Sequence, residues 1–330
     1  MNKPQKKILI TGGSGFIGSN LCKRLIQEGY DVTVFDNFSR GSSNNLSQIL
    51  TQITLIDGDI RSSNDVINAC KGMDSVIHLA YLNGTEYFYQ KPDLVLDIAV
   101  KGMVNILEGV KQNKIPEFVY ASSSEVYQTP TQLPTTESVS LVVPDPLNPR
   151  YSYGSGKIIG EMMTLHNASL FCDRILIFRP HNVFGANMGF EHVIPQLIKK
   201  IIDAPVDTDN TKTIQIRGDG TQTRAFIHID EFLDGLMVML NKGISGEIYN
   251  IGSMIELSIQ DLAISIGQLM DTSIKLITSE APLGETNRRC PDVSKLQGLG
   301  FNPPADIQKG LKDTINWYQQ YYQQGKSNDE

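Results

Sequence analysis

Apolar residues in the first 180 positions follow two alternating patterns. Short apolar runs typical of buried strands lie at 7–11, 31–35, 53–56, 75–79, 117–121 and 174–178. Between them, apolar side chains recur at helical spacing over 16–28, 93–111 and 153–170. In the helix predicted over 93–111, we expect Leu94, Ile98, Val104 and Leu107 to face inward. Strands that alternate with helices predict βαβ units and a doubly wound parallel sheet.

The alternation weakens beyond about residue 180. Helical spacing recurs over 192–203, 230–241, 258–269 and 306–323, mixed with short strands such as 247–251. We therefore expect an α/β domain over 1–180 and a smaller mixed α/β lobe over 181–330, with some segments crossing between the two. Five prolines between Thr129 and Pro149 predict a long loop, and a loop of that length in a compact domain is usually functional.

Composition narrows the class of protein. The 330 residues are 40% hydrophobic and 20% charged, as in ordinary globular chains, and the net charge of −7 disfavours binding to nucleic acid or to an anionic membrane surface. No apolar run reaches the roughly 18 residues of a membrane span. The four cysteines and five histidines fit no zinc pattern, so we expect no metal site and a cytoplasmic protein with reduced thiols.

A glycine-rich segment, Thr11-Gly-Gly-Ser-Gly-Phe-Ile-Gly18, joins the first predicted strand to the first helix. Gly12 permits the tight turn, Gly15 lets the backbone approach a pyrophosphate, and Gly18 allows close helix–strand packing. Asp36 lies 18 positions after Gly18, at the end of the second strand. A carboxylate at this place binds the ribose hydroxyls of a dinucleotide and repels a 2′-phosphate. This pattern predicts NAD in preference to NADP, although a nearby arginine could accept a 2′-phosphate.

Tyr153 and Lys157 open the helix that comes after the proline-rich loop. Their i, i+4 spacing places phenol and ammonium on one helix face, where the cation would lower the phenol pKa and let the tyrosine act as a base. Ser122-Ser-Ser-Glu-Val-Tyr127 follows the fifth strand, at the end of the sheet where parallel α/β proteins place their sites. A hydroxyl from this serine run could share the tyrosine's proton.

Taken in order, these motifs resemble the extended short-chain dehydrogenase/reductases, which have a Rossmann fold, and more narrowly their NAD-dependent nucleotide-sugar epimerases and dehydratases. The resemblance includes UDP-glucose 4-epimerases and UDP-glucuronate decarboxylases. It also rests on His78-Leu-Ala80, Arg179-Pro-His-Asn-Val-Phe-Gly185, Gly218-Asp-Gly-Thr-Gln-Thr-Arg-Ala-Phe226 and Arg288-Arg-Cys-Pro-Asp292. It covers nearly the whole chain and implies that residues 181–330 bind a nucleotide-diphosphate sugar.

The resemblance assigns roles to particular residues. It implies that Ser123, Tyr153 and Lys157 are catalytic, with Tyr153 as the base, and we expect Glu125 to be catalytic as well. The expected cofactor residues are Gly12, Gly15, Phe16, Ile17, Gly18, Asp36, Asn37, Ser39, Arg40, Asp59, Ile60, Leu79, Ala80, Tyr153 and Lys157. The expected substrate residues are Ser123, Ser124, Tyr153, Asn182, Val193, Arg224 and Arg288, with Arg289 beside the last. Asp59 suits the adenine edge or, equally, a strand-end cap.

The resemblance also implies oxidation of the sugar at C4, transiently giving a 4-keto sugar, and a homodimer through the helices at 93–111 and 153–170. Glu125 bears on the fate of that keto sugar, because simple 4-epimerases usually carry a small neutral residue there. We expect an epimerase, with a decarboxylase or a 4,6-dehydratase that uses Glu125 as alternatives, and a non-catalytic NAD-binding protein as a fourth. Gln128 departs from the pattern, since glycine usually comes after Val-Tyr.

Overall fold

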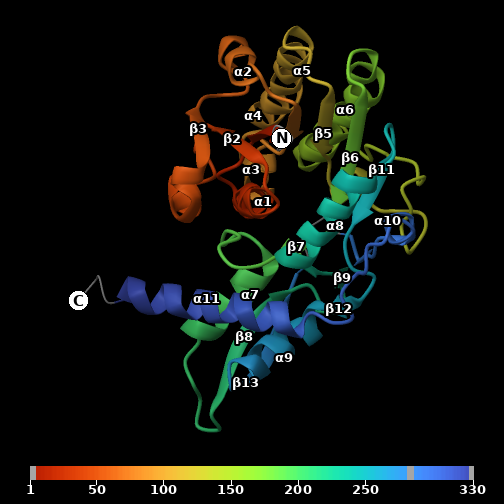
Figure 1. Cartoon of the computed structure of the whole chain (residues 1–330). Coiled ribbons are helices and arrows are strands. Elements are labelled where there is room, and N and C mark those ends of the chain that lie inside the picture. The colour runs from red at the N-terminus through yellow and green to blue at the C-terminus, as the bar shows by residue number, and fades with distance from the viewer. Residues whose placement is uncertain (1–4, 281–285, 327–330) are drawn as a thin grey trace. The chain divides into compact units, whose positions relative to one another are not determined.

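The computed structural model describes residues 5–280 and 286–326, and these form two compact units (Figure 1). The first unit comprises Met1–Gln128, Ser140–Pro180 and Leu236–Asn250. The second comprises Thr129–Val139, His181–Gly235 and Ile251–Glu330. The chain therefore enters the second unit three times and returns to the first twice.

A seven-stranded sheet forms the centre of the first unit, in the order β11-β6-β5-β4-β1-β2-β3. The pairings from β3 across to β6 are parallel, with Thr11 of β1 in register with Phe35 of β2 and His78 of β4. The strands are β1 Lys7–Thr11, β2 Asp31–Asp36, β3 Ile53–Asp57, β4 Ser75–His78, β5 Glu117–Ala121, β6 Arg174–Pro180 and β11 Ile248–Ile251. The predicted doubly wound Rossmann sheet is confirmed.

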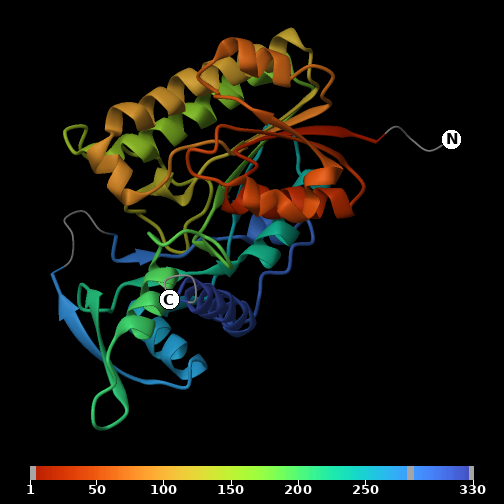
Figure 2. The same cartoon turned by 90° about the vertical axis from the view of Figure 1, so that its left-hand side faces the viewer.

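Helices cover both faces of this sheet (Figure 2). Helix α1 lies on one face, while α4 and α5, two consecutive segments of one helix, run over the other face beside α6. The helices of this unit are α1 Phe16–Gln27, η1 Ser43–Gln52, α2 Ser63–Ala69, α3 Thr85–Gln90, α4 Pro92–Asp97, η2 Ile98–Gly102, α5 Met103–Gln112, η3 Ser124–Tyr127, η4 Pro149–Tyr151, α6 Ser152–His166 and η5 Ala168–Leu170. Helix α8, Ile229–Lys242, spans the boundary between the units.

The helix predicted over 93–111 differs from the structure in one respect. A π-helical turn, η2, interrupts it at Ile98–Gly102 and shifts the phase of the residues after it. As a result Val104, expected to face inward, is 49% exposed, whereas Met103 and Ile106 are buried. The expectation for Val104 was wrong because strict 3.6-residue spacing cannot anticipate a π turn.

The second unit is a mixed α/β structure built of short strands and longer helices. Its three small sheets have the orders β10-β7, β12-β9-β14 and β13-β8. The elements are β7 Val183–Phe184, α7 Val193–Asp203, β8 Thr211–Arg217, β9 Thr223–Ala225, β10 Ile227–His228, β12 Glu256–Ser258, α9 Ile259–Leu269, β13 Ser273–Ser279, β14 Arg288–Arg289, α10 Ser294–Gln297 and α11 Gln308–Lys326. Over the described residues, no helix combines the length and apolarity needed to cross a membrane.

Candidate active site

The glycine segment forms a tight turn between β1 and α1. Gly12 has φ +73°, and a Cβ on Gly18 would lie 2.3 Å from the Gly12 carbonyl oxygen, so neither position accepts a side chain. Helix α1 has Gly15 as its N-cap, without a side-chain cap and without an acidic residue in its first turn. Its N-terminal N–H groups and positive dipole end are thus available to an anion.

Asp36 lies at the end of β2, against the glycine turn. Its two carboxylate oxygens accept hydrogen bonds from the backbone N–H groups of Ser14, at 2.9 Å, and Phe38, at 2.8 Å. The carboxylate is therefore held in place beside the turn while each oxygen keeps a second lone pair for another donor. Asn37 donates to Asp59 at 3.0 Å, and the Arg40 guanidinium lies 5.1 Å from the centre of the Tyr87 ring.

Asp59 comes after β3 and forms an ion pair with Arg61. The Arg61 side chain donates to both Asp59 oxygens, at 3.0 and 2.7 Å, and the Arg61 backbone N–H donates at 2.8 Å. These hydrogen bonds with Arg61 lower the pKa of Asp59 to about 2. These contacts fit a strand-end cap, and a contact with the adenine edge stays a prediction. Ile60 is buried in the core of the unit.

The residues expected to be catalytic come together at the end of β5. The Tyr153 phenol shares a hydrogen bond with Ser123. The Lys157 ammonium donates to the Ala121 carbonyl at 2.7 Å and lies 5.9 Å from the centre of the Tyr153 ring. Tyr153 is 7% exposed and stacks on Phe88, with ring centroids 4.8 Å apart.

The pKa shifts of this group differ from the expectation that the Lys157 ammonium lowers the pKa of the Tyr153 phenol. Burial raises the pKa of Tyr153, opposed by the hydrogen bond to Ser123 and reinforced by the negative charge of Glu125. Burial lowers the pKa of Lys157 to about 7, and the charge of Glu161 opposes this shift. Burial is the largest cause of both shifts, because a buried site disfavours the charged form of each group.

A buried ion pair beneath this centre was not anticipated from the sequence. Arg179 on β6 donates to Glu161 on α6 at 2.8 and 2.6 Å, and Ser122 donates to the same carboxylate at 2.5 Å. Arg179 also donates to the Tyr127 hydroxyl at 2.7 Å, which donates in turn to Asn250 at 2.8 Å. The available signal was the spacing, since Glu161 lies four residues after Lys157, as Lys157 lies four after Tyr153.

In the second unit, strand register separates the two adjacent arginines of β14. Arg289 is in register with Arg224 on the neighbouring strand β9, so these two side chains share a face. Arg288 points to the opposite face, where it forms a bidentate ion pair with Glu256 at 2.6 and 2.7 Å. The structure brings Arg224 together with Arg289 and not with Arg288, because neighbouring residues of a strand alternate in direction.

Two further expected substrate residues lie in this unit. Asn182 has a left-handed backbone, with φ +40°, and its side chain donates to the Ala225 carbonyl at 2.9 Å. That hydrogen bond ties Asn182 to the strand that carries Arg224. Val193 is the first residue of α7, whose N-cap, His192, provides no side-chain cap.

Comparison with known proteins identifies the family. Residues 8–252 match the model of the NAD dependent epimerase/dehydratase family. The chain belongs to that family. It is 33% identical to UDP-N-acetyl-alpha-D-glucosaminuronate decarboxylase of Bacillus cytotoxicus, over 96% of this chain and 98% of the relative. It is 28% identical to human dTDP-D-glucose 4,6-dehydratase, over 98% and 92% of the two chains.

A solved structure extends the likeness to the whole fold. UDP-N-acetylglucosamine 4-epimerase from Methanobrevibacter ruminantium, in complex with UDP-N-acetylmuramic acid, superposes with a TM-score of 0.85 at 25% identity. The likeness covers 97% of this chain and 100% of that one. Membership of the epimerase/dehydratase family therefore applies to both units, whereas its members differ in what they do to the sugar.

NAD is the cofactor of this epimerase/dehydratase family member. The first unit fits a dinucleotide on its own geometry. The turn at Gly12 and Gly18 has no room for side chains, and the N-terminus of α1 is uncapped by any side chain. The Ser14 hydroxyl within that turn is buried with no hydrogen-bond partner among the described residues, as expected of a group that a phosphate would satisfy.

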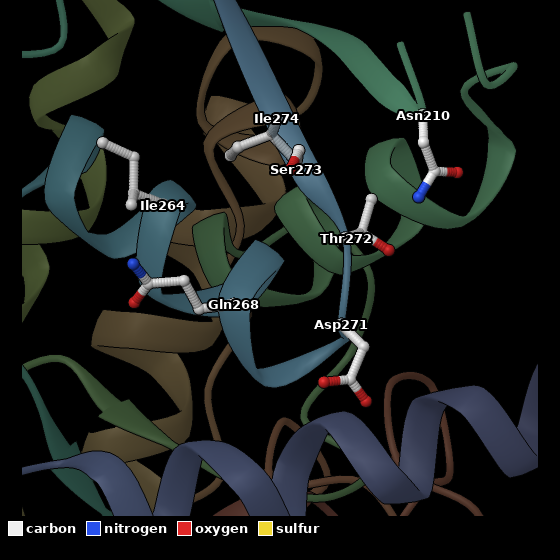
Figure 3. Close-up of a pocket in the computed structure, with 7 residues that line it drawn as sticks. All are labelled: Asn210, Ile264, Gln268, Asp271, Thr272, Ser273 and Ile274. Carbon is white, nitrogen blue, oxygen red and sulfur yellow. The ribbon is translucent and has the colours of Figure 1, made fainter. Parts of the chain in front are cut away.

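Figure 3 shows a separate hollow of about 410 Å³ in the second unit. It is lined by side chains of α9, β13, the turn between them and the turn before β8: Asn210, Ile264, Gln268, Asp271, Thr272, Ser273 and Ile274. None of these seven is basic, and one is acidic. The hollow thus offers no charge partner for a diphosphate, in contrast to the face that carries Arg224 and Arg289.

We predict that Glu161→Gln lowers the free energy of unfolding by about 3–5 kcal/mol, because the Arg179 guanidinium would keep its charge in a buried site without a counter-ion. Urea denaturation followed by circular dichroism measures the loss. The matched control is Glu28→Gln, which removes the same charge from the exposed pair with Arg24 and should cost less than about 1 kcal/mol. Equal losses in the two variants would contradict the assignment.

Proposed function

We propose that this protein is an NAD-dependent nucleotide-sugar epimerase that works through a transient 4-keto sugar. The observation that supports this most directly is the grouping of Ser123, Tyr153 and Lys157 at the end of β5. When it is ionised, a phenol that shares a hydrogen bond with a serine, close to an ammonium group, can take a proton from a sugar hydroxyl and return it.

In the proposed reaction the Tyr153 phenolate removes the proton of the C4 hydroxyl. The hydrogen bond from Ser123 keeps the Tyr153 oxygen in position for this transfer. Bound oxidised NAD would supply the acceptor for the hydride of C4, whose loss gives the 4-keto sugar. Lys157 stabilises the phenolate by its charge. Phe88 stacks on the Tyr153 ring and Tyr81 packs against its edge at 5.0 Å, so that water is kept from the phenol. The keto sugar then turns over within the site, so that hydride would return to its opposite face together with the proton from Tyr153, which completes the inversion.

The nucleotide end of the substrate is assigned to the second unit. We place the diphosphate on Arg224 and Arg289, whose guanidinium groups can each donate two parallel hydrogen bonds to phosphate oxygens. Arg288 is engaged by Glu256 and supports the strand instead. Asn182 and Val193 are proposed to contact the sugar or nucleotide, as the relatives of this family act on nucleotide sugars.

Glu125 favours a second candidate, decarboxylation of a sugar acid. Its charge acts on the Tyr153 phenol, which places a carboxylate close to the reacting position. A relative of 33% identity is a decarboxylase of UDP-N-acetyl-glucosaminuronate. Loss of CO₂ from the β-keto acid that C4 oxidation produces needs no base at C5, so Glu125 would orient the ring. In a 4,6-dehydratase the same carboxylate would remove the C5 proton.

Product masses distinguish these outcomes. The protein is supplied in turn with UDP-glucose, UDP-glucuronate, dTDP-glucose and GDP-mannose, and the products are analysed by mass spectrometry. We expect unchanged mass with altered stereochemistry at C4, and only a mild effect of Glu125→Gln, because epimerisation moves no proton at C5. Loss of CO₂ or water from a substrate that turns over well would overturn the epimerase assignment.

We predict that Tyr153→Phe lowers kcat about 10³-fold, since the ring still packs while the proton acceptor is lost. Steady-state turnover of the nucleotide sugar that the product masses identify provides the measurement. Tyr249→Phe is the control, because Tyr249 is equally buried in the same unit and its hydroxyl accepts a hydrogen bond from Ile244. Turnover near the wild-type rate in Tyr153→Phe would remove Tyr153 from its proposed role.

We also propose a homodimer formed through α4–α5 and α6. Leu96, Val100 and Val104 make an exposed apolar stripe along the first helix, and Ile159 and Met162 are exposed on α6. Apolar side chains at i, i+4 and i+8 on an outer face are expected of a helix that packs against a partner.

The prediction for the dimer is that Val104→Glu converts it to a monomer, because a charge would be buried without a counter-ion at the interface. Multi-angle light scattering at micromolar concentration measures the mass. Ile244→Glu is the matched change at an exposed apolar residue away from these helices. A monomeric wild type, or an unaffected dimer in Val104→Glu, would contradict the proposal.

A further inference from the structure

Gln128 has a backbone conformation that a residue with a side chain rarely adopts. It ends the η3 turn with φ +50° and ψ −109°, values close to the first central position of a type II′ turn, where glycine is strongly preferred. Such strain persists only where the surroundings impose it, and strained residues concentrate at functional sites. We therefore expect contacts of the Gln128 side chain to offset the free-energy cost of this backbone conformation.

The side chain of Gln128 is buried, with 6% exposure, and it holds one backbone carbonyl. Its Nε2 donates to the Glu125 carbonyl oxygen at 2.7 Å, and its backbone N–H donates to the same oxygen at 3.3 Å. On the other side the amide packs against the first turn of α6. A Cβ on Gly154, the residue after Tyr153, would lie 2.4 Å from that Nε2 atom.

The other end of Glu125 is held as well. Its backbone N–H donates to the Ser123 hydroxyl oxygen at 3.1 Å. The peptide groups on both sides of Glu125 are thus fixed, one by Ser123 and the other by Gln128. Both of these residues also lie against the helix turn that carries Tyr153, through the Ser123–Tyr153 hydrogen bond and the packing of Gln128 on Gly154.

We propose that Gln128 is a positioning residue that fixes the Glu125 carboxylate relative to the Tyr153 phenol. A glycine at 128 would adopt the same backbone without strain and keep the N–H hydrogen bond. The side-chain amide supplies what glycine cannot, a second hydrogen bond to the Glu125 carbonyl and a rigid spacer against α6. This inference rests on the proposed function only in that Glu125 and Tyr153 face a substrate.

The first test uses the protein without substrate. Gln128→Met keeps the length and burial of the side chain but has no N–H to donate. Hydrogen exchange read by mass spectrometry on peptides covering 123–128 should become at least about tenfold faster, because the turn loses a side-chain restraint. Unchanged exchange there would overturn the proposal, whatever the protein's activity proves to be.

The strain itself is tested by comparing Gln128→Gly with Gln128→Ala, since neither has the amide. We expect the glycine variant to melt about 3–6 °C higher, because only alanine retains the strained backbone. Glu108 in the interior of α5 provides the control. There Glu108→Ala should melt at a higher temperature than Glu108→Gly, because alanine has the higher helix propensity. A glycine variant at 128 that is no more stable than the alanine variant would overturn the proposal.

Kinetics then separate positioning from a general structural role. Gln128→Met should lower kcat on the substrate identified by product mass by no more than Glu125→Gln does, with KM changed less than about twofold. In a Glu125→Ala background the same substitution should have little further effect, because the residue through which it acts is gone. Equal effects of Gln128→Met in the two backgrounds would contradict action through Glu125. Absence of any wild-type turnover would instead refute the proposed function and leave the exchange and melting tests decisive.

Discussion

The ion pair between Arg179 and Glu161 is the interaction on which the rest of the first unit's site depends. Both side chains are almost completely buried, so their charges are tolerated only because each is paired and hydrogen-bonded. The pair joins β6 to α6, and Ser122, Tyr127 and Asn250 extend it to the end of β5, the η3 turn and β11. Elements that are far apart in the sequence are thereby held in one arrangement.

That arrangement determines the chemistry above it. Glu161 stands one helical turn beyond Lys157, and its negative charge opposes the burial that lowers the lysine's pKa. Ser122, bound to Glu161, immediately precedes Ser123, which shares the Tyr153 proton. A carboxylate buried beneath the proposed centre thus influences both the charge of the lysine and the place of the serine. This is the preorganisation that an active site needs from the residues that support it.

The local sequence pattern predicted the features that depend on residues close together in the chain, such as strand bounds and the glycine turn. The bounds of β1 and β5 follow from short apolar runs in the sequence. The tight turn follows from the glycines, because Gly12 has a positive φ. Local pattern did not predict the exposure of Val104, or that Arg289 and not Arg288 would share a face with Arg224. A π turn changed the phase of α5, and a strand register decided which of two adjacent arginines faces Arg224. The i, i+4 spacing places Glu161 on the helix face of Lys157, but no local pattern indicates its partner, Arg179, on β6.

The segment from Ser122 to Gln128 is where local preference and observed structure disagree most. It contains buried hydroxyls, a half-buried glutamate and a glutamine in a backbone conformation suited to glycine. A sequence selected for stability alone would place glycine at 128 and an apolar pair at 161 and 179. Natural sequences generally agree with their fold in local propensity, hydrophobic pattern and packing, and they depart from this agreement at functional sites. The position of this segment, at the end of β5 and against the helix that carries Tyr153, places those departures together at the proposed catalytic centre.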